Sequence, residues 1–245
     1  MSYPRTAASF LIAITSIAAW PGVVFGQQLA PFSGTPVGAL HPAWKESGLP
    51  ADRQVPRSRL TPTLLEGEPV LQLATDRSYG VLTHDWRGAT PGRLQWRWQL
   101  VRGLPQADIA RKAGDDAALK VCVFFDQPLA DIPLLQRAAL SLARNATGQD
   151  LPSATLCYLW DNRYPAGTQG ANPYSARVRY LVLDGPASPS GQWITQQRNV
   201  QEDFARLFGA ESASMPPVLA VAVGADSDNT QGQSLAYLSQ MRWIP

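Results

Sequence analysis

The stretch RLQWRWQL, residues 93–100, alternates strictly between polar and apolar side chains, and Val101 ends the predicted strand. Such a period of two is what a strand with one buried face requires. The apolar set and the polar set fall on opposite faces: Leu94, Trp96, Trp98 and Leu100 against Arg93, Gln95, Arg97 and Gln99. The pattern therefore predicts a half-buried strand whose two tryptophans lie in a core.

Short segments of similar character recur on both sides of this strand, separated by glycine, proline and polar turns. One of them, Leu119–Phe125, is nearly all apolar, which is typical of a strand covered on both faces. The other predicted strands are Leu60–Leu65, Val70–Thr75, Tyr79–Asp85, Ala154–Trp160, Arg177–Leu183, Gln192–Gln197, Val218–Val223 and Leu235–Ile244.

Two helices interrupt the strands. Asp131 is positioned to cap a helix that runs to about Arg144, with Pro133 in its first turn. Asn199 is positioned to cap a second helix over 199–208, with Glu202 three residues later as in a capping box. Many short strands with only two helices predict an all-β fold, either a β-sandwich or a barrel, with the helices at its periphery.

The first residues have the pattern of a cleavable signal peptide. Arg5 precedes the apolar stretch Ala7–Ala19, and the small residue Gly26 stands before Gln27. The apolar run is shorter than the about 20 residues that a transmembrane anchor needs. We therefore expect a signal peptide at 1–26, an irregular N-terminal arm at 27–39 and a single β-sandwich domain at 40–245, in a periplasmic or secreted protein without a membrane anchor.

The net charge limits the classes of partner that the protein is expected to bind. Removing residues 1–26 takes away one basic residue, Arg5, so the formal net charge falls from +2 to +1. A nearly neutral chain lacks the basic footprint of a nucleic-acid-binding protein. It also lacks the basic patch that anionic lipids attract. No Gly-x-Ser-x-Gly and no His-Glu-x-x-His motif occurs, so the serine-hydrolase and zinc-protease classes have no support. The sequence does not indicate an oligomeric state.

Two cysteines, Cys122 and Cys157, lie inside predicted strands. Export would permit a disulfide if those strands were neighbours in register. Cysteine is also often buried as a small apolar residue, and disulfide geometry is demanding. We expect both side chains to be buried and, by a small margin, reduced.

Five stretches of the sequence resemble one secreted bacterial family, a domain of unknown function with the number 3047. They are WRWQL (96–100), AGDDAALKVCVFFD (113–126), YLWDNRYPAG (158–167), GQWITQQRNVQEDFARLFG (191–209) and GADSDNTQGQSLAYLSQMRW (224–243). The resemblance covers roughly residues 40–244. It implies a jelly-roll-like, antiparallel two-sheet β-sandwich akin to carbohydrate-binding modules, and it implies no established activity. Cys122 and Cys157 depart from the family pattern, which would have tyrosine or other core residues there.

Aspartates gather in two turns. Asp226, Asp228 and Asn229 lie in one loop, and Asp115 and Asp116 precede the apolar strand at 119–125. Asp and Asn commonly close turns by bonding their own backbone. The same oxygens are also suited to a polar ligand, and the 226–230 loop to Ca²⁺, although no cofactor is required. Loops far apart in sequence meet at one end of a sandwich, so we expect some of these residues to converge around a groove.

Three further residues are candidates for ligand binding. Trp160 ends a strand, and Asn162 follows it in a polar loop that suits a sugar; the alternative is a core tryptophan followed by a turn. Arg97 lies on the polar face of its strand and is positioned to balance the charge of the aspartates.

We expect a non-catalytic protein that binds a carbohydrate or envelope glycan. Two alternatives remain open: a glycan-active enzyme that uses the clustered aspartates, and an envelope scaffold that binds another protein. An aromatic trough at a strand face favours the first function. Two converging buried carboxylates favour an enzyme, and a broad apolar patch favours a scaffold.

Overall fold

The computed structural model describes residues 28–36, 38–47, 49, 54–86, 92–148 and 150–245. The expected signal peptide at 1–26 and its cleavage point before Gln27 lie outside the described residues.

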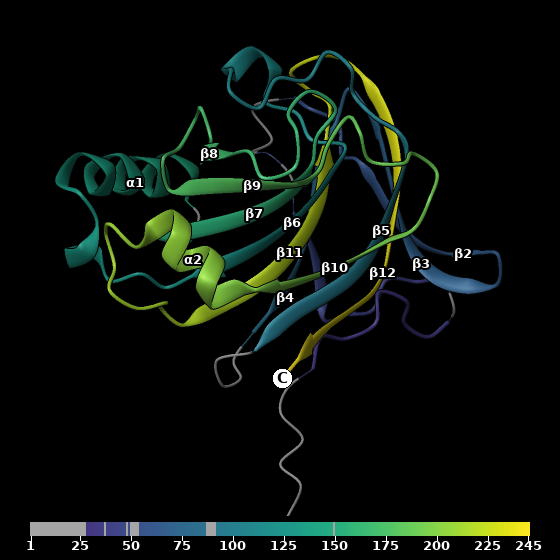
Figure 1. The fold of residues 1–245 in the computed structure, drawn as a ribbon, viewed down its shortest axis with the longest axis horizontal. Coiled ribbons are helices and arrows are strands. Elements are labelled where there is room, and N and C mark those ends of the chain that lie inside the picture. Colours follow the sequence, from purple (N-terminus) through teal and green to yellow (C-terminus); the bar gives the residue numbers. More distant parts are fainter. Residues whose placement is uncertain (1–27, 37, 48, 50–53, 87–91, 149) are drawn as a thin grey trace, which may run out of the picture.

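The described chain forms two β-sheets that face each other as two layers (Figure 1). The seven-stranded sheet has the order β1-β4-β11-β6-β7-β9-β8, and the five-stranded sheet has the order β10-β5-β12-β3-β2. The first comprises β1 (Trp44–Ser47), β4 (Tyr79–Asp85), β6 (Leu119–Phe125), β7 (Ala154–Trp160), β8 (Gln169–Ala171), β9 (Val178–Asp184) and β11 (Val218–Asp226). The second comprises β2 (Arg59–Leu65), β3 (Glu68–Asp76), β5 (Arg93–Arg102), β10 (Ile194–Asn199) and β12 (Gln233–Ile244).

The expected two-sheet β-sandwich is confirmed. Among the described residues, every strand pair is antiparallel except β7 with β9, which run parallel. The parallel pair arises because the chain leaves β7, forms the short strand β8 at the sheet edge and then turns back into β9 between them. A parallel pair needs such a crossover, whereas a hairpin gives an antiparallel pair.

The core lies between the sheets, and β5 fills it as its alternation predicts. Leu94, Trp96, Trp98 and Leu100 are buried. Trp96 packs on Tyr158 of β7 with 5.3 Å between the ring centres. Trp98 packs on Trp160 at 5.9 Å. Because side chains alternate along a strand, every second residue of β7 points into the core, and the residues between them lie on the outer face of the sheet.

Two strands have no clear sequence signal. β1 pairs with β4 near the start of the expected domain, where no strand was predicted and where Trp44 packs on Phe32 with 4.7 Å between the ring centres. β8 has three residues and pairs only with β9. Both lie at the edges of the seven-stranded sheet. Pairing with a neighbour makes them strands, because intrinsic preference over three or four residues is weak.

The helix α2 (Val200–Phe208) begins as expected. The Asn199 side chain accepts a hydrogen bond from the Glu202 backbone N–H, and its amide donates to the Glu202 carboxylate at 2.7 Å. Phe204 and Phe208 are buried in the core, and Phe204 packs on Phe125 at 4.8 Å between the ring centres. The helix thereby closes part of the core beside the seven-stranded sheet (Figure 1).

The first helix starts later than expected. α1 runs from Leu134 to Thr147 with Pro133 at its N-cap position, so Asp131 is not the cap. Asp131 instead ends a separate turn of 3₁₀-helix that begins at Leu129. Proline has the fixed φ angle that suits the start of a helix, so it moves the boundary past Asp131. Along α1 the side chains of Leu134, Leu135 and Leu142 are exposed.

None of the helices in the described ranges has the length and apolar content needed to cross a membrane.

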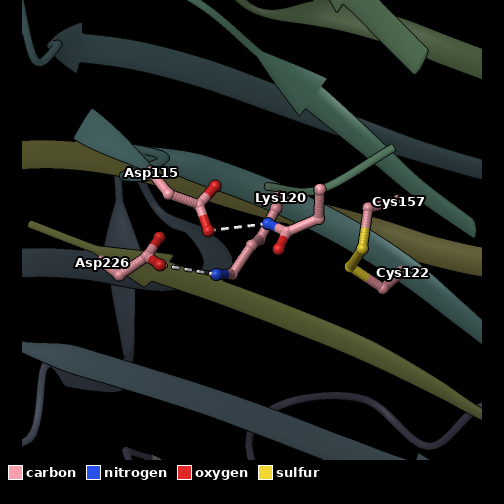
Figure 2. Close-up of a disulfide and its surroundings, with 6 residues drawn as sticks. Asp115, Lys120, Cys122, Cys157 and Asp226 are labelled. Carbon is pink, nitrogen blue, oxygen red and sulfur yellow. Dashed lines mark hydrogen bonds and ion pairs between the residues drawn. A yellow bond between two sulfur atoms is a disulfide. The ribbon is translucent and has the colours of Figure 1, made fainter. Parts of the chain in front are cut away.

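The expectation of reduced cysteines was wrong. Cys122 and Cys157 form a disulfide, and their Cα atoms are 4.1 Å apart (Figure 2). The two residues stand directly opposite each other in the register of β6 and β7. Their separation of 35 residues includes α1, so no local pattern could show that these strands are neighbours. The pairing of β6 with β7 brings the two sulfur atoms to bonding distance.

We expect the double substitution Cys122→Ser with Cys157→Ser to lower the free energy of unfolding by about 3 to 4 kcal/mol, because the bridge restricts the unfolded chain. Chemical denaturation of the wild type and the variant measures this. A reducing agent should lower the stability of the wild type and leave the variant unchanged. Equal stability of the two proteins would show that the bridge does not form.

Candidate functional site

A groove of about 670 Å³ lies on the outer face of the seven-stranded sheet. Pockets that bind small ligands usually have volumes of about 300–1,000 Å³. The floor is built from side chains of β4, β11, β6, β7 and β9 that point away from the core, and loops form its walls. Five of the eight residues singled out in the sequence line this groove: Asp115, Asp116, Asp226, Asp228 and Asn229.

A buried ion pair stands at one end of the groove. The Lys120 ammonium lies 2.9 Å from a carboxylate oxygen of Asp226 (Figure 2). The other Asp226 oxygen accepts the backbone N–H of Ala117 at 2.9 Å. Tyr79 opposes Asp226 in the register of β4 and β11, and Lys120 opposes Gly224 in the register of β11 and β6. The register of the three adjacent strands β4, β11 and β6 therefore brings Lys120 close to Asp226.

Gly224 makes room for this arrangement. A Cβ atom at position 224 would lie 2.7 Å from the Gly80 carbonyl oxygen and 3.3 Å from Lys120 Cε. Real side chains do not approach a backbone oxygen so closely. The absence of a side chain at 224 lets the stem of Lys120 cross β11 toward Asp226.

Burial controls the ionisation of the pair. Desolvation raises the pKa of Asp226 to about 6, although the Lys120 ammonium opposes this shift. Burial by itself would lower the pKa of Lys120, but the attraction of Asp226 together with that of Tyr79 and Asp115 outweighs it, and the lysine pKa is raised. At neutral pH the pair is therefore ionised, and the carboxyl takes up a proton in mildly acidic solution.

The Asp116 carboxylate has a structural role. One carboxylate oxygen accepts the Asn229 backbone N–H at 3.0 Å, and the other accepts the Thr230 backbone N–H at 2.7 Å and the Thr230 hydroxyl at 2.5 Å. The side chain is buried. Asp116 thus ties the 226–230 loop to the turn before β6, and its hydrogen-bonding capacity is largely used within the protein.

The carboxylates of Asp115 and Asp228 retain more capacity to accept hydrogen bonds than that of Asp116. Burial raises the pKa of both carboxyls. Asp115 accepts one hydrogen bond from the Asn172 amide at 2.7 Å. In the described part of the chain, Asp228 Oδ1 is buried without a hydrogen-bond partner. These two carboxylates are the ones best placed to accept hydrogen bonds from a ligand.

Tyr174 forms a fixed wall of the groove. Its hydroxyl donates to the Lys112 backbone carbonyl at 3.0 Å and lies 3.2 Å from the Asn229 side-chain oxygen. The Lys112 ammonium lies 5.4 Å from the ring centre. The side chain is nevertheless 58% exposed. An exposed aromatic ring whose hydroxyl is hydrogen-bonded to the backbone is a rigid surface for an apolar ligand face.

The other three candidates lie elsewhere. Trp160 is buried in the core against Trp98. Asn162 accepts the Leu104 backbone N–H at 2.8 Å and so braces two loops. Arg97 belongs to the five-stranded sheet and stacks on Trp193 at 5.1 Å from the ring centre. The structure does not bring Arg97 to the aspartates, and Lys120 holds the place of their balancing charge.

The sequence suggests Ca²⁺ only for the 226–230 loop. In the structure, Asp226 and Asp228 of that loop and Asp116 from the turn before β6 offer one oxygen each within 4.8 Å of one another. The donor set fits Ca²⁺ poorly. Asp116 is already bonded to the loop, and the Lys120 ammonium occupies the side of Asp226 that a cation would take. A divalent ion there would have to displace the lysine, and calcium prefers six to eight oxygen ligands.

Sequence reasoning did not select Lys120, Tyr79, Asn172 or Tyr174. Lys120 had a usable signal, because it is the single charged residue in the apolar segment LKVCVFF. A charged residue is rarely buried without a partner. No sequence signal pointed to Tyr79, Tyr174 or Asn172, since their positions at the groove depend on segments that meet only in the folded chain.

The sequence matches a family described as a protein of unknown function (DUF3047) over residues 42–242. The chain belongs to this family. The match confirms the resemblance noted above. No curated protein matches the sequence.

Two solved structures are similar to this chain over most of its length. Endoglucanase 3 of Trichoderma harzianum, from family GH12, is 12% identical with a TM-score of 0.45, and the match covers 90% of this chain and 97% of that one. The K3 cleaved adhesin domain of Lys-gingipain from Porphyromonas gingivalis is 8% identical with a TM-score of 0.37, covering 89% and 100%. The likeness is too remote to say what this DUF3047 chain binds.

The raised pKa of Asp226 predicts a pH effect on stability. The folded protein holds this proton up to about pH 6, whereas the ordinary pKa is 3.8. The carboxyl's contribution to stability is therefore complete below about pH 4 and is lost as the pH rises to about 6. Relative to Asp226→Asn, the wild type should lose on the order of 3 kcal/mol of unfolding free energy over that window.

Denaturant unfolding at several pH values measures the difference. The control is Asp150→Asn, because the Asp150 side chain is 94% exposed; it should follow the wild-type pH dependence. A wild-type advantage over Asp226→Asn that stayed constant between pH 4 and 6 would contradict the raised pKa.

Proposed function

We propose that this protein is exported and binds a carbohydrate without catalysis, at the polar end of the groove. The observation that carries the proposal is the exposed, tethered ring of Tyr174 beside the free acceptors of Asp115 and Asp228. A sugar presents apolar C–H faces, which stack on aromatic rings, and hydroxyls, which donate hydrogen bonds. Both partners are present at one place, and the Tyr174 ring is already held in position before a ligand arrives.

The disulfide supports the proposed location. Disulfides persist in oxidising compartments such as the periplasm and the extracellular space, and they are rare in the cytosol. The Cys122–Cys157 bridge lies in the floor of the groove, so the proposed binding surface is complete only where the bridge forms. This agrees with the signal peptide that the first 26 residues predict.

Glycan hydrolysis is the second candidate function. The observation in its favour is the raised pKa of Asp226, which burial brings to about 6, beside a second carboxylate at Asp228. A carboxyl of this kind serves as the general acid in glycosidases. However, both Asp226 oxygens are occupied, one by Ala117 and the other by Lys120. This occupancy favours binding over catalysis.

We expect Tyr174→Ala to weaken binding of cellotetraose or chitotetraose at least tenfold, because it removes the stacking surface. Isothermal titration calorimetry measures the affinity. The matched control is Tyr237→Ala, since Tyr237 lies on β12 of the other sheet. It should leave the affinity unchanged. Equal affinity of wild type and Tyr174→Ala for every sugar bound would place the binding site elsewhere.

Incubation of the wild type with the same tetraoses should release no new reducing ends. If it does release them, and Asp226→Asn does not, the protein is a glycosidase and the proposal of a non-catalytic role is wrong. Burial of Asp226 would then serve proton donation, because a carboxyl with a pKa of about 6 remains partly protonated near neutral pH.

A further inference from the structure

Most of the groove is apolar. Beyond its polar end the floor consists of outward-facing side chains from five adjacent strands, and the loop residues at the far end include Leu151 and Pro152. The floor residues include Val81, Ala222, Phe124, Leu159, Val178, Tyr180 and the Cys122–Cys157 bridge, and the polar Thr155 stands opposite Phe124 in the register of β6 and β7. Sugar units that lay on this apolar floor, beyond the polar end, would leave their hydroxyls unpaired, and unpaired polar groups are costly to bury.

The apolar floor is continuous with the polar end. Along β6 the outward positions are Lys120, Cys122 and Phe124 in succession. Residues in a strand are spaced by about 3.3 Å, so Phe124 lies about 13 Å along the strand from the ion pair. A ligand anchored at Lys120 and Asp226 can therefore extend along β6 over the disulfide toward Phe124.

The charges at the polar end restrict the head of such a ligand. Among the described residues that line the groove, Lys120 carries the one positive charge and stands against the four carboxylates of Asp115, Asp116, Asp226 and Asp228. An anionic head, whether carboxylate or phosphate, would meet net negative charge in a partly desolvated site. A head rich in hydroxyl donors instead suits carboxylate acceptors.

We propose that the natural ligand is an amphiphile: an uncharged sugar head held at the polar end, with an alkyl or acyl chain that lies along the apolar floor over the disulfide. This inference rests on the proposed carbohydrate binding and adds the chemical class of the ligand. The sugar supplies orientation through hydrogen bonds, and the chain supplies most of the affinity through burial of apolar surface.

Chain length gives a quantitative test. Burial of one methylene is worth up to about a fourfold gain in affinity. Calorimetric titration uses methyl, butyl, hexyl and octyl β-glucosides and the matching N-acetyl-β-glucosaminides, below their micelle concentrations. Affinity should rise about two- to fourfold per methylene until the chain reaches the end of the floor. Octanoate and octanol, which lack the sugar, should bind at least tenfold more weakly than the better octyl glycoside.

Substitutions of floor residues test whether the alkyl chain of the ligand lies on the floor. Phe124→Ser should flatten the rise with chain length and leave the affinity for the methyl glycoside unchanged. Val81→Ser tests the same surface from β4, should Phe124→Ser fail to fold. The matched control is Leu64→Ser, since Leu64 is 56% exposed on β2 of the other sheet. It should keep the wild-type rise.

The outcomes separate the two proposals. If methyl and octyl glycosides bind equally, the amphiphile inference is overturned while carbohydrate binding stands. If octanol or octanoate binds as well as the octyl glycosides, the sugar contributes nothing and the proposed function falls. If no glycoside of any chain length binds, both are overturned. A rise that persists in Phe124→Ser and Val81→Ser would place the chain outside this groove and overturn the inference.

Discussion

The contact of Trp96 and Trp98 with Tyr158 and Trp160 joins the two sheets, and the site depends on it. Once β7 turns Tyr158 and Trp160 inward, strand alternation leaves Cys157 and Leu159 facing out. Register with β6 then brings Cys122 opposite Cys157. The residues of β7 that form the floor of the groove are therefore those that alternate with its core residues.

Both faces of the central strands are apolar for different reasons. The inner face is covered by the five-stranded sheet, and the outer face is covered in part by loops that leave a groove between them. An apolar surface that a protein keeps but does not fill commonly marks an interaction site. The buried pair of Lys120 and Asp226 marks where that surface ends. Removing one partner of such a pair would leave an uncompensated buried charge, which is strongly destabilising.

The aspartates that gather at the polar end divide by what their oxygens already bind. Asp116 builds the loop, and Asp226 is held by Lys120 and Ala117. Asp115 and Asp228 keep acceptors for an outside partner. Proximity of carboxylates alone would have suggested a metal site or a catalytic pair. The accounting of hydrogen bonds favours a polar contact with a ligand, because buried acceptors in folded proteins are normally satisfied.

The sequence by itself determined the all-β class, the core tryptophans of β5 and the capped start of α2, because alternation and capping are local patterns. The choice of a two-sheet sandwich over a barrel came from the family resemblance. The sequence also indicated that the aspartates of the two turns would meet. Only the tertiary structure decided that Cys122 pairs with Cys157, that Trp160 faces the core, and that Lys120 takes the place expected for Arg97. These facts depend on which strands are neighbours and on which face of a sheet a residue points to. Strand order joins segments separated by whole elements such as α1, and no local pattern records it.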